Sequence, residues 1–191
     1  MAPASRGTRL PDLLTATRIV LVPVLLWLIA RVRSPELLDP ARLTAVGTYF
    51  AMGLSDLLDG LLARRMGATS DRGAMLDAAA DKLATLAPLF YWALVRPDAF
   101  APVPLWLPVT IFLLDGVLVA SLVRARLVRA TPPEARHNQT GRAATLIAFL
   151  LVGGIAAGMP AVLVLPAGVL LVGLRLLAVA AYLRSWALSP G

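Results

Sequence analysis

Six long apolar runs, separated by short polar connections, constrain the fold of this chain more than any other feature. A helix needs about 20 mostly apolar residues to cross the hydrocarbon core of a bilayer. The sequence is 59% hydrophobic, whereas a soluble domain has roughly 45–50% apolar residues. No strand-like alternation competes with a helical pattern in these runs. We therefore predict one all-α integral membrane domain over residues 1–191, with six transmembrane helices at 12–30, 43–62, 74–95, 103–123, 143–159 and 161–183.

The connections between these runs contain turn-forming residues. Pro35 and Pro40 mark the first connection, and the second spans residues 67–73 with a glycine at each end. Met159 and Pro160 make up nearly the whole fifth connection. This short connection predicts that the last two helices form a tight antiparallel pair.

Positive charge predicts the orientation of the helices, because cytoplasmic loops carry an excess of Lys and Arg. With the N-terminus in the cytoplasm, most of the 18 Lys and Arg residues fall on the cytoplasmic side. We predict a multi-pass protein of the inner (cytoplasmic) membrane, with both termini and the active site in the cytoplasm. Residues 1–11 would form a short cytoplasmic or interfacial segment. The net charge of +7 follows from this topology, so nucleic acid is not an expected partner. The exceptions are Arg31, Arg33, Arg42 and Arg96 on the outside and Arg175 within the sixth helix.

Four aspartates lie near the cytoplasmic ends of the second and third predicted helices. Asp56 and Asp59 share a helix face at spacing i, i+3, and Asp77 and Asp81 share one at i, i+4. A carboxylate in the middle of a membrane costs roughly 2.5–3.5 kcal/mol, so four together need a positive partner. Hard divalent cations with oxygen ligands suit this role, and two of them can clamp a phosphoryl group. We predict a site for two divalent cations, Mg²⁺ or Mn²⁺.

Other kinds of site are less compatible with the sequence. The chain has no cysteine and one histidine, which excludes thiolate and histidine-based metal sites. A small cation transporter is the alternative from another functional class. A transporter would distribute its acidic residues through the membrane depth, whereas these four lie toward one end.

Three residues between the aspartate pairs are candidates for substrate contact. Gly60 removes a side chain where a substrate can approach the helix backbone. Arg64 either meets a phosphate or ribose or sets the membrane topology, and Ser70 either caps the third helix or contacts a ligand.

The segment that contains these residues resembles the signature of the CDP-alcohol phosphatidyltransferases at every fixed position. The matching residues are Asp56, Asp59, Gly60, Ala63, Arg64, Gly73, Asp77 and Asp81. The resemblance implies the family's six-helix fold and its reaction, in which a CDP-linked lipid gives its phosphatidyl group to an alcohol and CMP leaves. It also implies a homodimer within membrane lipids.

The resemblance further implies roles for individual residues. Asp56 and Asp77 would bridge two metal ions, Asp59 would bind one ion, and Asp81 would bind the other. Asp81 would also be the base that takes the proton of the acceptor. The CDP-lipid contacts implied by the resemblance to the family are Gly60, Arg64 and Ser70. A weaker match over residues 10–18 resembles the family's cytidine-contacting segment and adds Asp12 and Thr15.

The acceptor alcohol is predicted from further likeness to one branch of the family. Thr15 and Arg18 before the first apolar run, and the stretch 140–145, resemble the phosphatidylglycerophosphate synthase and cardiolipin synthase branch. Glycerol 3-phosphate is the expected acceptor of a CDP-diacylglycerol donor, with phosphatidylglycerol and inositol phosphate as alternatives. One departure is that Leu114 precedes Asp115, where members of the branch often have arginine before an acidic residue.

Four arginines are candidates for binding the acceptor, and membrane anchoring is the alternative role for each. The sixth-helix arginine lies so deep that it requires a polar partner or a water-filled cavity. The candidates are Arg18, Arg124, Arg142 and Arg175.

Overall fold

The computed structural model describes the backbone of residues 9–66, 71–95, 97–127 and 139–187. Within these ranges it describes the side chains of residues 19–55, 79–95, 97–120 and 139–184. The described chain contains six helices and no strand, which confirms the all-α prediction. The helices are α1 (Arg9–Arg31), α2 (Pro40–Met66), α3 (Asp71–Val95), α4 (Trp106–Leu127), α5 (Gln139–Ala156) and α6 (Ala161–Ala187).

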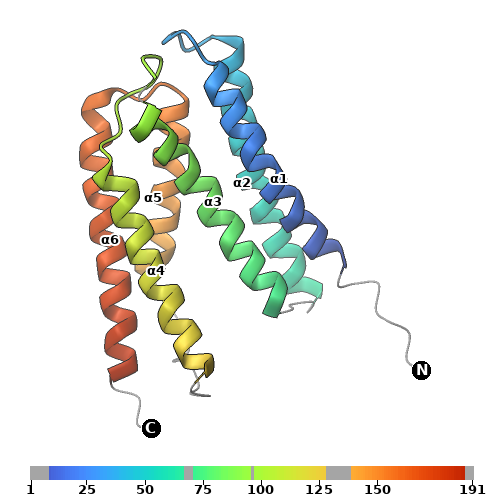
Figure 1. Cartoon of the computed structure of the whole chain (residues 1–191). Coiled ribbons are helices and arrows are strands. Elements are labelled where there is room, and N and C mark those ends of the chain that lie inside the picture. Colours follow the sequence, from blue (N-terminus) through green and yellow to red (C-terminus); the bar gives the residue numbers. More distant parts are fainter. Residues whose placement is uncertain (1–8, 67–70, 96, 128–138, 188–191) are drawn as a thin grey trace.

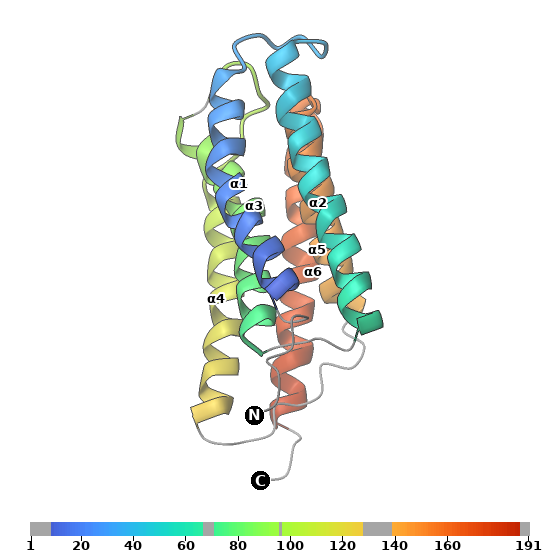
Figure 2. The ribbon, with the colours of Figure 1, turned by 90° about the vertical axis from the view of Figure 1, so that its right-hand side faces the viewer.

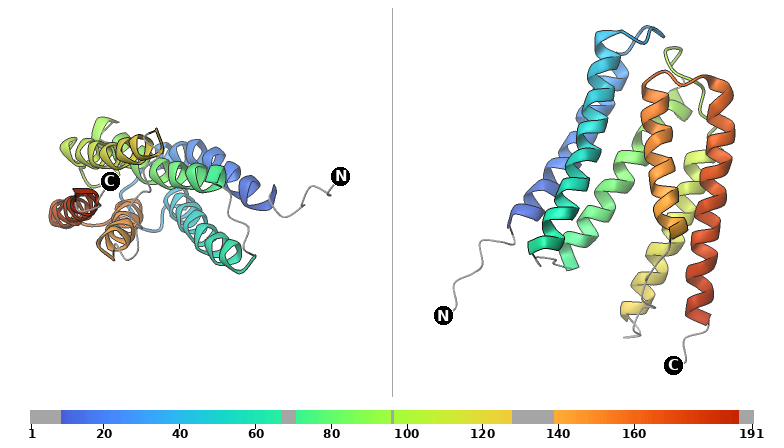
Figure 3. Two further views of the ribbon diagram at one scale, coloured as in Figure 1. Left: turned by 90° about the horizontal axis from the view of Figure 1, so that it is seen from below. Right: turned by 180° about the vertical axis from the view of Figure 1, so that it is seen from behind.

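The helices form two layers of three and run alternately up and down along the chain (Figures 1 and 2). Seen from below, α4, α3 and α1 form one row and α6, α5 and α2 form the other (Figure 3). Helix contacts agree with this arrangement. Neighbours within a layer pack together, and so do the facing pairs α1 with α2, α3 with α5, and α4 with α6.

The two ends of the bundle differ. At one end α1, α3 and α5 begin and α2, α4 and α6 finish, and we call this the site end. The opposite end, which we call the closed end, contains the α1–α2, α3–α4 and α5–α6 connections (Figure 1). Both ends of the described chain lie at the site end, as an even number of antiparallel passes requires.

Two helix boundaries differ from the predicted ones for identifiable reasons. The fourth helix begins at Trp106 instead of 103, because Phe100 and Val103 are buried against the bundle as part of an irregular connection. The fifth helix ends at Ala156 instead of 159, because Gly158 takes a positive φ of 92°. Its N–H donates to the Ile155 carbonyl at 3.1 Å, and the N–H of Met159 donates to the Gly154 carbonyl at 2.8 Å. This glycine-centred cap stops the helix and makes the predicted tight turn to α6.

Other boundaries shift by three or four residues at helix starts. The fifth helix begins at Gln139 instead of 143, and the second begins at Pro40 instead of 43. Asp39 caps α2, because its Oδ1 accepts from the N–H groups of Ala41 at 2.8 Å and Arg42 at 3.0 Å. The first helix begins at Arg9, so the last three residues of the predicted N-terminal segment 1–11 are helical.

The core and the outer surface of the bundle are both apolar. Large side chains such as Trp92, Leu25 and Ile111 are fully buried between the layers. Equally apolar side chains point outward, including Phe112 at 57% and Val162 at 76% exposure. A helix that is hydrophobic on all sides is typical of a buried or membrane-embedded position.

Length and hydropathy single out two of the helices. Among the described residues, Gln139–Ala156 and Ala161–Arg184 are long and apolar enough to cross a bilayer, and Ile19–Arg31 and Trp106–Ala120 are shorter apolar stretches. Two spans therefore meet this criterion, and the predicted number of six remains a proposal.

Glycine and aromatic residues join α2 to α5. The ring of Phe149 stacks on Tyr49, with centroids 4.9 Å apart, and meets Phe50 edge-on at 5.4 Å. A Cβ atom at Gly53 would lie 2.3 Å from the Phe149 ring, and one at Gly153 would lie 2.9 Å from the Phe50 ring. The two helices approach this closely because both positions lack a side chain.

Arg42 holds the closed end together. Its side chain is 1% exposed, and its Nη1 donates to the Ala156 carbonyl at 3.0 Å. Its Nη2 donates to the carbonyls of Ser34, at 3.1 Å, and Ala99. The guanidinium also lies over the ring of Phe100, 4.9 Å from its centroid. One side chain therefore links the α1–α2 loop, the α3–α4 loop and the end of α5.

Candidate active site

The aspartate-bearing segments of α2 and α3 lie at similar depth in the bundle. Asp56 and Asp59 stand ten and seven residues before the end of α2, which is about 15 and 10 Å at 1.5 Å per residue. Asp77 and Asp81 stand six and ten residues after the start of α3, about 9 and 15 Å. Helices α1 and α5 each pack against both α2 and α3. The side chains of Asp56, Asp59 and Asp77 lie outside the described residues.

Asp81 is the aspartate of this set whose side chain is described, and it is half-buried. It interacts electrostatically with the hydroxyl of Tyr49 on α2. Its backbone carbonyl accepts a hydrogen bond from Thr85 Oγ1 at 3.1 Å, one helical turn later. Asp81 therefore lies within electrostatic range of α2.

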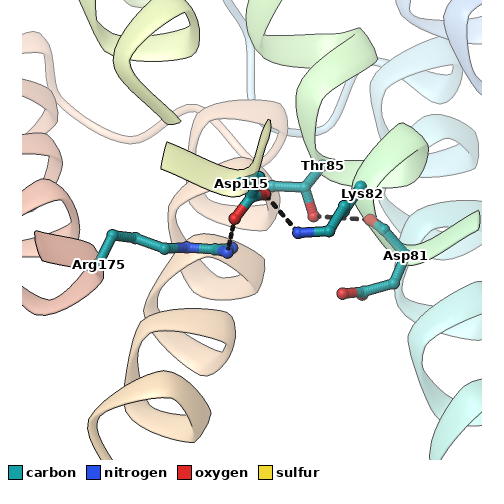
Figure 4. A network of polar contacts seen from close by, with 5 residues as sticks. All are labelled: Asp81, Lys82, Thr85, Asp115 and Arg175. Atoms are coloured by element: carbon teal, nitrogen blue, oxygen red, sulfur yellow. Dashed lines mark hydrogen bonds and ion pairs between the residues drawn. The ribbon is translucent and has the colours of Figure 1, made fainter. Parts of the chain in front are cut away.

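A buried ion network lies beside Asp81. Asp115, on α4, is 4% exposed and takes both of its partners from other helices. Its Oδ2 is 2.7 Å from the Nζ of Lys82 on α3, and its Oδ1 accepts a hydrogen bond from Nη1 of Arg175 on α6. Figure 4 shows Lys82 and Arg175 approaching Asp115 from opposite sides. The polar partner that the depth of Arg175 requires is thus Asp115.

Asp115 and Lys82 were not among the predicted site residues. A usable signal was present, because Asp115 and Arg175 are isolated opposite charges in the middle of two long apolar runs. Charges in such positions are costly unless they are paired. The pairing itself joins residues 60 positions apart, and it became evident from the packing of α4 on α6.

The remaining candidates lie on helix segments near the site end. Arg142 is in the first turn of α5 and its side chain is exposed. The others occupy the beginning of α1 or the ends of α2 and α4, and their side chains lie outside the described residues. These are Asp12, Thr15, Arg18, Gly60, Arg64 and Arg124, while Ser70 falls wholly outside the described part of the chain.

Comparison with known proteins identifies the family. A sequence profile of the CDP-alcohol phosphatidyltransferase family matches residues 8–186. This chain belongs to that family. The match covers α1 to α5 and all but the last residue of α6. The many outward-facing apolar side chains agree with the membrane setting of CDP-alcohol phosphatidyltransferases. Together these findings indicate a membrane protein.

Several curated CDP-alcohol phosphatidyltransferases are similar to this chain. A cardiolipin synthase (CMP-forming) of Streptomyces coelicolor is 34% identical over 143 residues, which are 73% of this chain and 61% of that protein. A probable phosphatidylglycerophosphate synthase of Mycobacterium tuberculosis is 31% identical over 129 residues, 68% of this chain and 57% of that protein. The chain thus spans about three fifths of the length of these two relatives.

A third similar protein covers less of the chain. The rice chloroplastic CDP-diacylglycerol–glycerol-3-phosphate 3-phosphatidyltransferase 1 is 40% identical over 78 residues, 41% of this chain and 21% of that protein. The three names point to the phosphatidylglycerophosphate synthase and cardiolipin synthase branch that the sequence resembled.

Proposed function

We propose that this protein transfers a phosphatidyl group from CDP-diacylglycerol to glycerol 3-phosphate and releases CMP, in phospholipid biosynthesis. The observation that carries the proposal is the complete family signature on α2 and α3, in segments that lie at equal depth at the site end. The names of the Mycobacterium and rice relatives support this acceptor.

The donor set fits divalent metal ions. Four carboxylates supply only hard oxygen ligands, and Asp81 on α3 lies within electrostatic range of Tyr49 on α2. Asp56, Asp59, Asp77 and Asp81 would hold two Mg²⁺ or Mn²⁺ ions, which neutralise charge on the diphosphate of the donor. Asp56 and Asp77 would bridge the two ions in this arrangement.

In this reaction the protein positions the two substrates and accepts a proton. Asp81 would take the proton of the acceptor hydroxyl, whose oxygen then forms a bond to the lipid-bearing phosphorus. The bond from this phosphorus to the CMP oxygen breaks, and CMP leaves with the bonding electrons. Asp12, Thr15, Gly60, Arg64 and Ser70 would contact the CDP-lipid. The acceptor would be bound by Arg18, Arg124, Arg142 and Arg175.

Phosphatidylglycerol is the second candidate acceptor, because the Streptomyces relative is named as a cardiolipin synthase. Inositol phosphate is the third, on the sequence resemblance alone. A cation transporter is disfavoured, because the aspartates lie toward one end of two helices and the chain belongs to a transferase family.

The setting of the reaction is part of the proposal. We propose six membrane spans in the inner membrane, both termini in the cytoplasm, and a homodimer. The excess of Lys and Arg toward the site end supports this orientation.

The decisive experiment combines purified protein with CDP-diacylglycerol and each of the three acceptors, and measures CMP release. We expect turnover with glycerol 3-phosphate, loss of turnover with excess chelator, and recovery on adding Mg²⁺ or Mn²⁺. If none of the three acceptors supports CMP release, the proposed reaction is wrong. Full turnover in excess chelator would overturn the metal site.

A further inference from the structure

The ion network of Asp115, Lys82 and Arg175 contains two cations and one carboxylate. The Asp115 carboxylate is shared between Lys82 and Arg175, whose side chains are 27% and 11% exposed. A single cation would neutralise the carboxylate, and bringing a second charge out of water adds a further desolvation cost. The network therefore carries a net charge of +1 in the middle of an apolar bundle.

The two cations keep hydrogen-bond donors for another partner. The Nε of Arg175 is buried and has no acceptor in the described part of the chain. Lys82 has three N–H donors, and Asp115 is its ion-pair partner among the described side chains. A buried donor such as the Nε of Arg175 is costly unless an acceptor completes it.

The network also joins the base to an acceptor-binding arginine. Lys82 directly follows Asp81, and Figure 4 shows the Asp81 carboxylate and the Lys82 ammonium extending to the same side of α3. Arg175 is on α6, which packs on α4 but lies in the other layer from α3. Asp115 on α4 contacts both helices through these two side chains.

We propose that Asp115 is a positioning residue that fixes Arg175 and Lys82 relative to Asp81, so that the pair binds the phosphate of an acceptor alcohol. This rests on the proposed function, in which two divalent ions balance the four aspartates and leave the network's surplus charge for a substrate. The ligand is an alcohol that carries a phosphate, either a soluble phosphomonoester or a lipid phosphodiester.

Three variants test this role in the purified, metal-loaded protein. Asp115→Asn removes the charge that holds both cations, and Asp115→Glu keeps it on a side chain one methylene longer. Lys82→Met removes the surplus cation and leaves the balanced Asp115–Arg175 pair. Asp98→Asn, at an exposed aspartate in the α3–α4 connection, is the matched control.

The KM values for donor and acceptor are measured separately, with glycerol 3-phosphate in one arm and phosphatidylglycerol micelles in the other. We expect Asp115→Asn and Lys82→Met to raise the KM for the acceptor by about tenfold or more, which corresponds to the loss of about one charged hydrogen bond. The KM for CDP-diacylglycerol should change by less than about twofold, Asp115→Glu should recover part of the loss, and Asp98→Asn should match the wild type. The arm that supports wild-type turnover shows which phosphate source the pair binds.

Calorimetric titration of glycerol 3-phosphate into the wild type and Asp115→Asn gives a readout apart from turnover. A lower acceptor KM in Asp115→Asn would overturn the proposal, because the carboxylate would then compete with the acceptor. Equal losses for donor and acceptor in every variant at Asp115 would show a merely structural role. If Asp115→Asn does not fold, an unchanged acceptor KM in Lys82→Met overturns the proposal by itself.

Failure of the proposed function gives a different pattern. In one outcome, the wild type releases no CMP and still binds glycerol 3-phosphate, with this binding lost in Asp115→Asn. That result would support the phosphate site and contradict the proposed reaction. If the wild type is active and the variants have its acceptor KM, the proposed reaction stands and the role of Asp115 is wrong.

Discussion

Asp81 and Asp56 have different proposed tasks, so their asparagine variants should differ. Asp81→Asn removes the base but leaves Asp56, Asp59 and Asp77 to hold one ion. We expect CDP-lipid affinity to be retained and turnover to fall by roughly 10²–10⁴-fold. Asp56→Asn removes a bridging ligand, so lipid affinity should fall together with turnover. Near-normal turnover in Asp81→Asn, with Asp77→Asn inactive and its binding intact, would move the base to Asp77.

Arg42 should contribute strongly to stability although it lies at the end opposite the aspartates. Arg42→Ala leaves the carbonyls of Ala156 and Ala99 buried without this donor. At about 1–3 kcal/mol for each buried acceptor, the loss should be about 2–6 kcal/mol. The measurement is a clear fall in the Tm of the protein in detergent. Arg33→Ala, at an exposed arginine on the same side of the bundle, should leave the Tm unchanged, and equal shifts in both variants would contradict the role of Arg42.

Single residues show where sequence reasoning stops. The depth of Arg175 in an apolar run was enough to predict that it needs a polar partner, and the structure identifies Asp115. Arg42 was interpreted only as one of the few positive charges on the outside. Its acceptors are backbone carbonyls in segments up to 114 residues away, and backbone carbonyls leave no residue-type signal in a sequence.

At the scale of helices, the approach of α2 to α5 depends on glycine. Gly53→Ala should lower stability by roughly 1–3 kcal/mol, because its Cβ would overlap a Phe149 ring that is confined by Tyr49 and Phe50. Activity should fall as well, since Gly53 is one turn before Asp56. Gly47→Ala on the same helix meets nothing within 4 Å and is the matched control. A fall in Tm for Gly47→Ala as large as that for Gly53→Ala would contradict this account.

The number and type of helices were predictable from the apolar runs, because six such runs leave few other folds. The boundaries were less predictable, since tertiary contacts decide them. Val103 looks like the start of an apolar helix in the sequence, yet it is buried in a connection that covers the closed end. The aspartate spacing predicted two helix faces, and the equal depth of α2 and α3 is consistent with it.

At the scale of the whole molecule, the proposed topology is testable with single cysteines, because the chain has none of its own. Glu36 at the closed end and Gln139 at the site end are both exposed. In intact cells, an impermeant maleimide should label Glu36→Cys at once and Gln139→Cys only after permeabilisation. The reverse pattern would invert the orientation, and labelling of both positions from one side would contradict six spans.

The Arg42 linkage also determines how the bundle can move. Helices α2 and α6 have 27 residues each, a length of about 40 Å. The guanidinium ties three segments together at the closed end. We therefore expect the helices to tilt about that end. A tilt of about 5° around this pivot displaces the far tips by about 3.5 Å, more than the roughly 2.0–2.1 Å of a Mg²⁺–oxygen bond. A small rotation about the closed end would therefore be amplified along α2 and α3 toward the segments that carry the aspartates.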